Sequence, residues 1–300
     1  MKDVEGKVAF ITGGSSGVGL GIVRAFAAAG MKVVFTYRRK AHLDEAMGFF
    51  DAAGQTVHPL YLDVTDREAM AAAADETEKQ FGKIHVLVNN AGVNIFSPMD
   101  EATYDDWDWI IDVNLKGIIN GQVTFIPRIK AHGEGGHVVN TGSMASFLPG
   151  PAAGIYTTTK YAIRGMTECL RYCLAPHGIG VSLLCPGLVV SNIHASEEIR
   201  PQKLGNRGYT PDPEVIKNIG DVHALGMDPL EVGEKTLRGI RNNDLYILTH
   251  PEHKSDLQEV FDRVIAAVPD EVPDPKRIEV EEARRKEIAE AQEVIDNMQH

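Results

Sequence analysis

The sequence predicts an α/β protein with a doubly wound, seven-stranded parallel sheet and a C-terminal helical extension. Two observations support this prediction. Short apolar segments alternate with longer segments of helical apolar spacing, which favours parallel strands joined by right-handed helical crossovers. The first apolar segment, 7–11, also leads through a glycine-rich turn into a segment of helical spacing, 20–29.

The remaining elements follow in the same alternation. Further strands are expected at 32–39, 57–62, 84–89, 137–140, 180–184 and 245–248, and further helices at 42–53, 66–81, 105–129, 156–175 and 229–241. The last helix has Asp228 as its N-cap and Pro229 just inside its start. Residues 192–226 are rich in Gly and Pro and weakly patterned, which is typical of a substrate lid, with disorder as the alternative.

The glycine-rich turn has the spacing GxxxGxG between a strand and a helix. Glycines there let the backbone approach a pyrophosphate, which binds at a helix N-terminus where free N–H groups and the macrodipole favour anions. The turn therefore predicts a Rossmann dinucleotide-binding unit, although a tight loop alone can have a similar sequence. The expected contacts are Gly13, Ser15, Ser16, Gly17, Val18 and Gly19.

Tyr156 and Lys160 are four residues apart, so a helix places the phenol and the ammonium on one face. A nearby positive charge favours the phenolate and lowers the phenol pKa from about 10. This pair by itself is compatible with an acid-base catalyst or with an ordinary solvated helix face.

Together the motifs resemble those of the classical short-chain dehydrogenase/reductase family, over roughly residues 4–250. The matching positions occur in the family's order: 12–19, Asn89-Asn90-Ala91-Gly92, Asn114, Ser143, Tyr156 with Lys160, and Pro186-Gly187. The resemblance implies that Tyr156 is the acid-base residue and that Ser143 orients the substrate oxygen. It also implies that Lys160 assists Tyr156 and holds the nicotinamide ribose, and that Asn114 keeps a helix locally open and binds a water in a proton path.

Coenzyme choice depends on the end of the second strand. Tyr37 stands where NAD enzymes usually have an acidic residue for the ribose 2′-hydroxyl, and Arg38 and Arg39 follow it. Guanidinium groups can bind a 2′-phosphate, so the sequence predicts that NADP(H) is preferred and NAD(H) possible; the alternative is that both arginines are ordinary solvated residues. The resemblance adds further coenzyme contacts: Asp63, Val64, Asn90, Ala91, Gly92, Pro186, Gly187, Val189 and Ser191.

The substrate pocket is expected to be largely apolar. Its candidate walls are Val93, Ile95, Met144, Phe147, Leu148, Leu188 and His194, beside Ser143 and Tyr156. The stretches 103–111, 117–127 and 191–201 are further similar to bacterial dehydrogenases that oxidise the benzylic alcohol of lignin-derived aryl ethers. A bulky aryl alcohol or ketone is therefore expected. The alternatives are a 3-ketoacyl or steroid-type hydroxyl dehydrogenase and, outside enzymes, a non-catalytic NADP-binding sensor or scaffold.

Composition agrees with a globular enzyme: 300 residues, 43% of them hydrophobic, and a formal charge of −12 that disfavours nucleic acid and anionic membranes as partners. No apolar run reaches the length of about 18 residues that spans a bilayer, and the first residues lack a signal-peptide core, so a cytoplasmic protein is expected. Cys169 and Cys173 are expected to be buried helix-face thiols rather than metal ligands, and no metal is expected.

We assign residues 1–250 to one dinucleotide-binding catalytic domain and residues 251–300 to a helical extension. Leu257, Val260, Phe261, Val264 and Ile265 predict an amphipathic helix, and Ile288, Ala291, Ile295 and Met298 a weaker, highly charged one. The extension either packs on its own subunit or reaches a partner. The family resemblance implies a homodimer or homotetramer that pairs through the helices carrying Asn114 and Tyr156.

Overall fold

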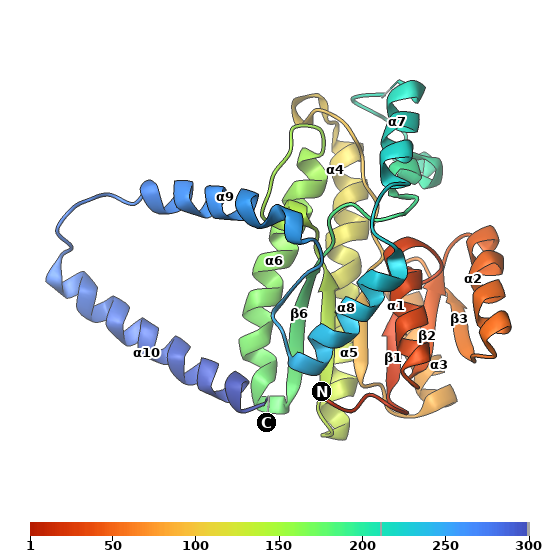
Figure 1. Cartoon of the computed structure of the whole chain (residues 1–300), viewed down its shortest axis with the longest axis horizontal. Coiled ribbons are helices and arrows are strands. Elements are labelled where there is room, and N and C mark those ends of the chain that lie inside the picture. Colours follow the sequence, from red (N-terminus) through yellow and green to blue (C-terminus); the bar gives the residue numbers. More distant parts are fainter. Residues whose placement is uncertain (211, 299–300) are drawn as a thin grey trace.

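The computed structural model describes residues 1–210 and 212–298 and contains one parallel seven-stranded sheet, as predicted (Figure 1). The strand order is β3-β2-β1-β4-β5-β6-β7. The strands are β1 (Val8–Ile11), β2 (Lys32–Tyr37), β3 (Val57–Tyr61), β4 (Val86–Asn89), β5 (Gly136–Thr141), β6 (Ile179–Cys185) and β7 (Tyr246–Leu248). The order reverses between β1 and β4, and ligands of such sheets bind outside the carboxyl ends of the strands at this point.

Helices cover both faces of the sheet. They are α1 (Gly17–Ala28), α2 (Lys40–Ala53), α3 (Arg67–Phe81), α4 (Tyr104–Ile111), α5 (Gly117–His132), α6 (Gly154–Leu174), α7 (Pro213–His223), α8 (Pro229–Asn242), α9 (Lys254–Ala266) and α10 (Pro275–Asn297). Alternation along β1 shows how the two faces are built. Ile11 packs in the core with Phe26 of α1, whereas Phe10 points to the other core and stacks on Phe125 of α5 with ring centroids 4.3 Å apart.

Two glycines let α1 and α8 approach each other closely. A Cβ on Gly21 would lie 1.7 Å from the Pro229 carbonyl oxygen, and one on Gly233 would lie 2.1 Å from the Gly21 carbonyl oxygen. Both distances are far inside van der Waals contact, so no larger residue fits without separating the helices. This packing fixes α1, whose N-terminus borders the candidate site.

The helix expected at 105–129 forms, but a π-helical turn at Asp112–Lys116 separates α4 from α5. Asn114 lies in this turn and is 1% exposed. The family resemblance implied a locally opened helix at Asn114, and the structure confirms it. Single π-turns of this kind are frequent at functional sites.

The described residues of the segment 192–226 are more ordered than its weak pattern indicated. It contains two 3₁₀ helices, Ile193–Ile199 and Gln202–Leu204, and the helix α7. The sequence analysis expected a substrate lid here, with disorder as the alternative, and did not predict the helix α7. Asp212 caps α7 and Pro213 opens it, which is the same start signal that correctly located α8 at Asp228 and Pro229.

The C-terminal extension forms the two predicted helices. Figure 1 shows α9 leaving the body beside α6 and α10 turning back toward the C-terminal end of α6. Leu257 packs against the core, the Phe261 ring lies 6.3 Å from the Phe147 ring, and Ile295 is 1% exposed. Most other side chains of α9 and α10 are exposed, so the extension contacts its own chain mainly at its two ends.

Cys169 and Cys173 of α6 are exposed, and the prediction that they are buried was wrong. Residues four apart share one helix face, but here that face points outward, and Arg171 takes the inward position with 7% exposure. Within the described residues, no helix combines the length and apolar character needed to span a membrane.

Candidate active site

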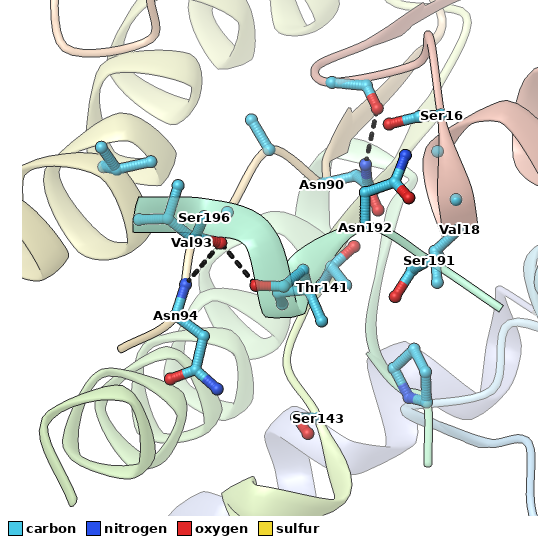
Figure 2. A pocket seen from close by; sticks show the side chains of 18 of the residues that line it. Ser16, Val18, Asn90, Val93, Asn94, Thr141, Ser143, Ser191, Asn192 and Ser196 are labelled. Atoms are coloured by element: carbon cyan, nitrogen blue, oxygen red, sulfur yellow. Dashed lines mark hydrogen bonds between the residues drawn. The ribbon is translucent and has the colours of Figure 1, made fainter. Parts of the chain in front are cut away.

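A cavity of about 500 Å³ lies at the carboxyl ends of the central strands, where the strand order reverses. It brings together the glycine-rich turn, the end of β2, the segment after β4, and residues of β5 and α6. Lining residues that the sequence predicted are Gly13, Ser15, Ser16, Gly17, Val18, Gly19, Tyr37, Arg38, Arg39, Val64, Asn90, Ala91, Gly92, Val93, Ser143, Leu148, Tyr156, Lys160, Pro186, Gly187, Val189 and Ser191. Figure 2 shows Ser16, Asn90, Ser191 and Asn192 around one end of this pocket and Ser143 toward the other.

The glycine turn meets the steric requirements of a dinucleotide-binding loop. Gly13 has a φ of +66° and would place a Cβ 2.9 Å from the Ala91 Cα, while a Cβ on Gly19 would lie 2.1 Å from the Gly13 carbonyl oxygen. The Ser16 side chain makes no capping hydrogen bond to α1. The first N–H groups of α1 therefore stay available to an anion in the cavity, which fits a pyrophosphate.

Asn90 joins the segment after β4 to this turn. Its Nδ2 donates hydrogen bonds to the carbonyl oxygens of Thr12 and Gly13, both at 3.1 Å. Its backbone N–H donates to Thr12 Oγ1 at 2.9 Å. Asn90 thus braces the turn while its own side chain lines the cavity.

Lys160 lies next to Tyr156 in the cavity wall. Its Nζ donates a hydrogen bond to the Thr141 carbonyl oxygen at 2.8 Å and lies 5.2 Å from the centre of the Tyr156 ring. Lys160 is only 4% exposed, and burial lowers its pKa to about 8. Most Lys160 side chains are therefore still protonated at pH 7.

Burial raises the pKa of Tyr156 to about 12, and the neighbouring Ser143 hydroxyl offsets only part of this rise. The sequence-based expectation that Lys160 lowers this pKa does not hold in this structure. Removal of the phenol from water is the largest cause of the rise, because an anion is more costly to bury than a neutral hydroxyl. Tyr156 is accordingly a protonated group, suited to donate a proton.

Ser143 follows β5 at the start of a short 3₁₀ turn. Its Oγ accepts a hydrogen bond from the Ala145 N–H at 3.2 Å, and its own N–H donates to Ser146 Oγ at 3.3 Å. Ser146 Oγ in turn donates to the Lys160 carbonyl oxygen at 2.9 Å. These bonds fix Ser143 to the helix that carries Tyr156 and Lys160.

Asn114 does not line the cavity, but it holds the backbone of a segment that does. Its Oδ1 accepts a hydrogen bond from the Val93 N–H at 2.8 Å, and its Nδ2 donates to the Val93 carbonyl oxygen at 2.9 Å. A Cβ on Gly92 would lie 3.4 Å from Asn114 Oδ1 and 3.9 Å from Lys160 Nζ, so both groups border the same point of the backbone. Asn114 therefore holds the segment after β4 beside Lys160.

The coenzyme-choice residues lie at the end of β2. Arg38 and Arg39 line the cavity with Tyr37 and His42. Arg38 Nη2 lies 3.4 Å from Asp63 Oδ2, and Arg39 Nη1 lies 3.2 Å from Glu198 Oε2. Asp63 itself does not line the cavity and acts here as the ion-pair partner of Arg38.

Several predicted substrate residues lie elsewhere. Met144 and Phe147 belong to a hydrophobic core cluster, each 5% exposed, and His194 stacks on His223 with ring centroids 5.9 Å apart. Neither these three nor Leu188 and Ile95 line the cavity, so they do not form the expected walls. Residues adjacent to them in the sequence line the cavity instead. The sequence alone does not show which side chains of a short irregular segment point into a cavity.

Other lining residues were missed. Phe96, Gly150, Ala153, Ile193, Ile199 and His223 also line the cavity. Ala153 precedes Tyr156 by three residues on the same wall, a spacing that offered a signal. Ile199 and His223 come from the 192–226 segment, in which the Asp212-Pro213 helix start was the signal that the sequence offered.

Comparison with known proteins agrees with this geometry. A family model described as short chain dehydrogenase matches residues 7–202. The chain belongs to the short chain dehydrogenase family. It is therefore an oxidoreductase of the alcohol dehydrogenase type, in a family that binds nicotinamide coenzymes.

Individual relatives cover nearly the whole chain. The C alpha-dehydrogenase of a Sphingobium species is 42% identical over 277 residues, which are 92% of this chain and 91% of the relative. The structure of LigO from Sphingobium has a TM-score of 0.77 at 42% identity and 98% coverage of both chains. A short chain dehydrogenase from Burkholderia phymatum in complex with NAD has a TM-score of 0.83 at 32% identity, covering 91% of this chain and 99% of that one. The narrower resemblance inferred from the sequence is thus confirmed.

Proposed function

We propose that this short chain dehydrogenase uses NADP(H) in preference to NAD(H) and interconverts a secondary alcohol and a ketone on a bulky aryl substrate. The observation that carries the proposal is the convergence of Ser143, Tyr156 and Lys160 on one cavity that begins at the glycine-rich turn. The same cavity offers a helix N-terminus for a pyrophosphate and two guanidinium groups near the end of β2.

Each residue has a separate role in the proposed reaction. Tyr156, protonated because burial raises its pKa to about 12, donates its proton to the substrate oxygen during ketone reduction. Ser143 donates a hydrogen bond to the same oxygen and holds it toward Tyr156. When bound, the nicotinamide supplies or accepts the hydride at the substrate carbon, and its oxidised ring is positively charged.

Lys160 stabilises the phenolate that Tyr156 becomes after proton transfer. Its ammonium lies over the Tyr156 ring, and electrostatic stabilisation in a cavity shielded from water is stronger than in bulk solvent. Lys160 also has donors left beyond its bond to the Thr141 carbonyl, which suit the hydroxyls of the nicotinamide ribose. Asn114 keeps the backbone beside Lys160 in place and opens the helix at the π-turn for a water in a proton path.

The preference for NADP(H) rests on charge. No carboxylate stands at Tyr37, and Arg38 and Arg39 line this end of the cavity. The uncapped N-terminus of α2, which begins directly after Arg39, adds a further favourable field for an anion. A 2′-phosphate gains from all three features, whereas a 2′-hydroxyl gains little.

The proposal of an aryl substrate is based on the residues that line the cavity and on the relatives. Beyond the coenzyme motifs the lining is largely apolar, with Phe96, Leu148, Ala153, Ile193 and Ile199. The relative at 42% identity is named C alpha-dehydrogenase, which favours a substrate whose alcohol carbon adjoins a larger group. We also propose that the protein is cytoplasmic, as the sequence analysis expected. A homodimer or homotetramer is proposed because α5 and α6 expose Ile119, Val123, Tyr161 and Tyr172.

The decisive experiment assays benzylic, aliphatic and steroid alcohols and ketones with both coenzymes. The highest kcat/KM is expected for aryl substrates with NADP(H). Efficient turnover of small aliphatic alcohols with aryl compounds inert would contradict the substrate proposal and leave only the reaction class. A preference for steroid or 3-ketoacyl substrates would favour the other dehydrogenase types.

Tyr156→Phe tests the mechanism in the same assay. The variant should bind coenzyme normally but lose at least about 10²-fold in kcat, the usual scale of acid-base catalysis. Tyr104→Phe is the matched control, because Tyr104 is a highly exposed tyrosine that does not line the cavity, so the loss of its hydroxyl should leave kcat unchanged. Comparable turnover by the two variants would exclude Tyr156 as the acid-base group.

A further inference from the structure

A carboxylate from the segment after β6 lies on one of the two guanidinium groups assigned above to the 2′-phosphate. Arg39 Nη1 donates a hydrogen bond to Glu198 Oε2 at 3.2 Å, although the two residues are 159 positions apart. Their side chains are 42% and 61% exposed, so this ion pair is open to exchange with another anion.

The surroundings of Arg39 favour anions in general. Arg38 and His42 line the same part of the cavity, and α2 begins at Lys40 with no side-chain cap and no acidic residue in its first turn. Free N–H groups at a helix start together with guanidinium groups are typical of phosphate sites. In this structure the anion on Arg39 is the carboxylate of Glu198.

Glu198 belongs to the 3₁₀ helix Ile193–Ile199, which also forms part of the cavity wall through Ile193, Ala195, Ser196 and Ile199. Ser196 Oγ accepts a hydrogen bond from the Asn94 N–H at 3.1 Å and donates to the Ile193 carbonyl oxygen at 2.7 Å (Figure 2). One short element therefore carries both the ion pair with Arg39 and a wall of the cavity. A change at Arg39 reaches that wall through a few residues of the backbone.

We propose that Glu198 is a coenzyme-specificity residue that connects the 2′ position of the coenzyme to this wall. With NAD(H), the 2′-hydroxyl leaves Arg39 to Glu198, and the ion pair holds the 193–199 segment in place. With NADP(H), the 2′-phosphate competes with Glu198 for Arg39 and weakens that hold. The inference rests on the proposed function in one respect: it requires that Arg39 faces the 2′ position.

The test is Glu198→Gln, which removes the charge and keeps the shape. In direct titrations of the substrate-free protein, NADP⁺ should bind about three- to tenfold more tightly to the variant, and NAD⁺ affinity should change less than about twofold, as expected for loss of one exposed ion pair and one repulsive charge. The matched control is Glu45→Gln. Glu45 is an acidic residue of α2 that acts on His42 electrostatically, as Glu198 does. This variant should change either affinity less than about twofold.

Two further measurements separate the mechanism from a general charge effect. In a protein that already carries Arg39→Met, Glu198→Gln should raise NADP⁺ affinity no more than the Glu45→Gln control does. Trypsin cleavage at the exposed residues Lys203 and Arg207 should be faster in the NADP⁺ complex of the natural protein than in its NAD⁺ complex, and equally fast in both complexes of Glu198→Gln.

Three outcomes would overturn the proposal for Glu198. Glu198→Gln could raise the affinity for NAD⁺ as much as that for NADP⁺, or Glu45→Gln could raise NADP⁺ affinity equally. The gain in NADP⁺ affinity could also persist in the Arg39→Met background. The coenzyme proposal fails separately, if the natural protein binds NAD⁺ more tightly and Arg38→Ala leaves NADP⁺ affinity unchanged. A natural protein that prefers NADP⁺ with an inert Glu198→Gln would sink only the role of Glu198.

Discussion

The buried ion pair between Arg200 and Asp106 fastens the 192–226 segment to α4, and its removal should be strongly destabilising. Arg200 Nη1 donates to Asp106 Oδ1 at 2.6 Å, and the two side chains are 2% and 3% exposed. The guanidinium also lies 5.4 Å from the centre of the Trp109 ring and donates through Nε to the Leu204 carbonyl oxygen at 2.5 Å. Replacing Arg200 by Met keeps the length of the side chain but leaves the Asp106 carboxylate buried without its cation.

The expected loss is about 3 kcal/mol of unfolding free energy, at the low end of the 3–5 kcal/mol typical of breaking a buried pair. The low end applies because Asp106 Oδ2 still accepts hydrogen bonds from the N–H groups of Thr103 and Gly208, at 2.8 and 3.1 Å. For a chain of this length the midpoint of thermal unfolding should fall by about 5 °C. The KM for substrate should rise as well, because Ile193 and Ile199 of the same segment line the cavity.

Urea unfolding followed by circular dichroism measures the loss, with two comparison variants. Arg207→Met breaks the more exposed pair with Glu197, whose side chains are 43% and 26% exposed, and should cost less than about 1 kcal/mol. Arg200→Met combined with Asp106→Asn should recover part of the stability, because no buried charge is then left unpaired. The reasoning would be refuted if Arg200→Met were as stable as Arg207→Met. It would also be refuted if the double variant were no more stable than Arg200→Met alone.

The pH dependence gives a second check on the same pair. Burial tends to raise the pKa of Asp106, but hydrogen bonds from Thr103, Arg200 and Gly208 outweigh it and hold the pKa below its usual value. A carboxylate with a depressed folded-state pKa contributes stability that is present above the unfolded pKa of about 4 and is lost as pH falls through the folded value. The difference in unfolding free energy between the natural protein and Arg200→Met should therefore be constant near neutral pH and shrink as pH falls from the pKa of Asp106 in the variant through its lower pKa in the natural protein.

Three other predictions follow from the site and the extension. Lys160→Met should abolish turnover yet raise the free energy of unfolding by about 3 kcal/mol at pH 7, because burial lowers the pKa of Lys160 from 10.5 to about 8. This gain in stability should vanish as pH rises from about 8 to 10.5, and an unchanged urea midpoint at pH 7 would contradict the prediction. Arg38→Ala should weaken NADP⁺ binding by tens-fold and barely change NAD⁺ binding, as direct titration will show. A chain ending after His250 should lose its preference for bulky aryl substrates in kcat/KM or become insoluble, because Leu257 and Phe261 cover core residues; full solubility with the preference retained would show that the extension serves neither purpose.

Sequence patterns predicted the fold and the central part of the site, because both depend on the conformational preferences and spacing of residues that are close together in the chain. Alternating apolar segments specify parallel strands and crossover helices, and all seven strands lie where this alternation placed them. Glycines such as Gly13 and Gly19 are required by local backbone geometry, and Tyr156 and Lys160 share a face by helical spacing. The order of these motifs along the chain then identified the family that the comparisons confirm.

The sequence did not reveal contacts between distant segments. Met144 and Phe147 were expected in the cavity and lie in the core, because the rotation of a short turn depends on what packs around it. Cys169 and Cys173 share a face as expected, but tertiary packing turned that face outward.

The sequence by itself therefore determined the sheet, the glycine turn and the set of reactive side chains. Only the tertiary structure decided the charges around them. Burial sets Tyr156 at a pKa of about 12 and Lys160 at about 8, and folding brings Arg200 to Asp106 and Glu198 to Arg39 across more than ninety residues of chain. The physical reason is range: backbone preferences act over a few residues, whereas desolvation and ion pairing depend on every segment that the fold gathers at one place.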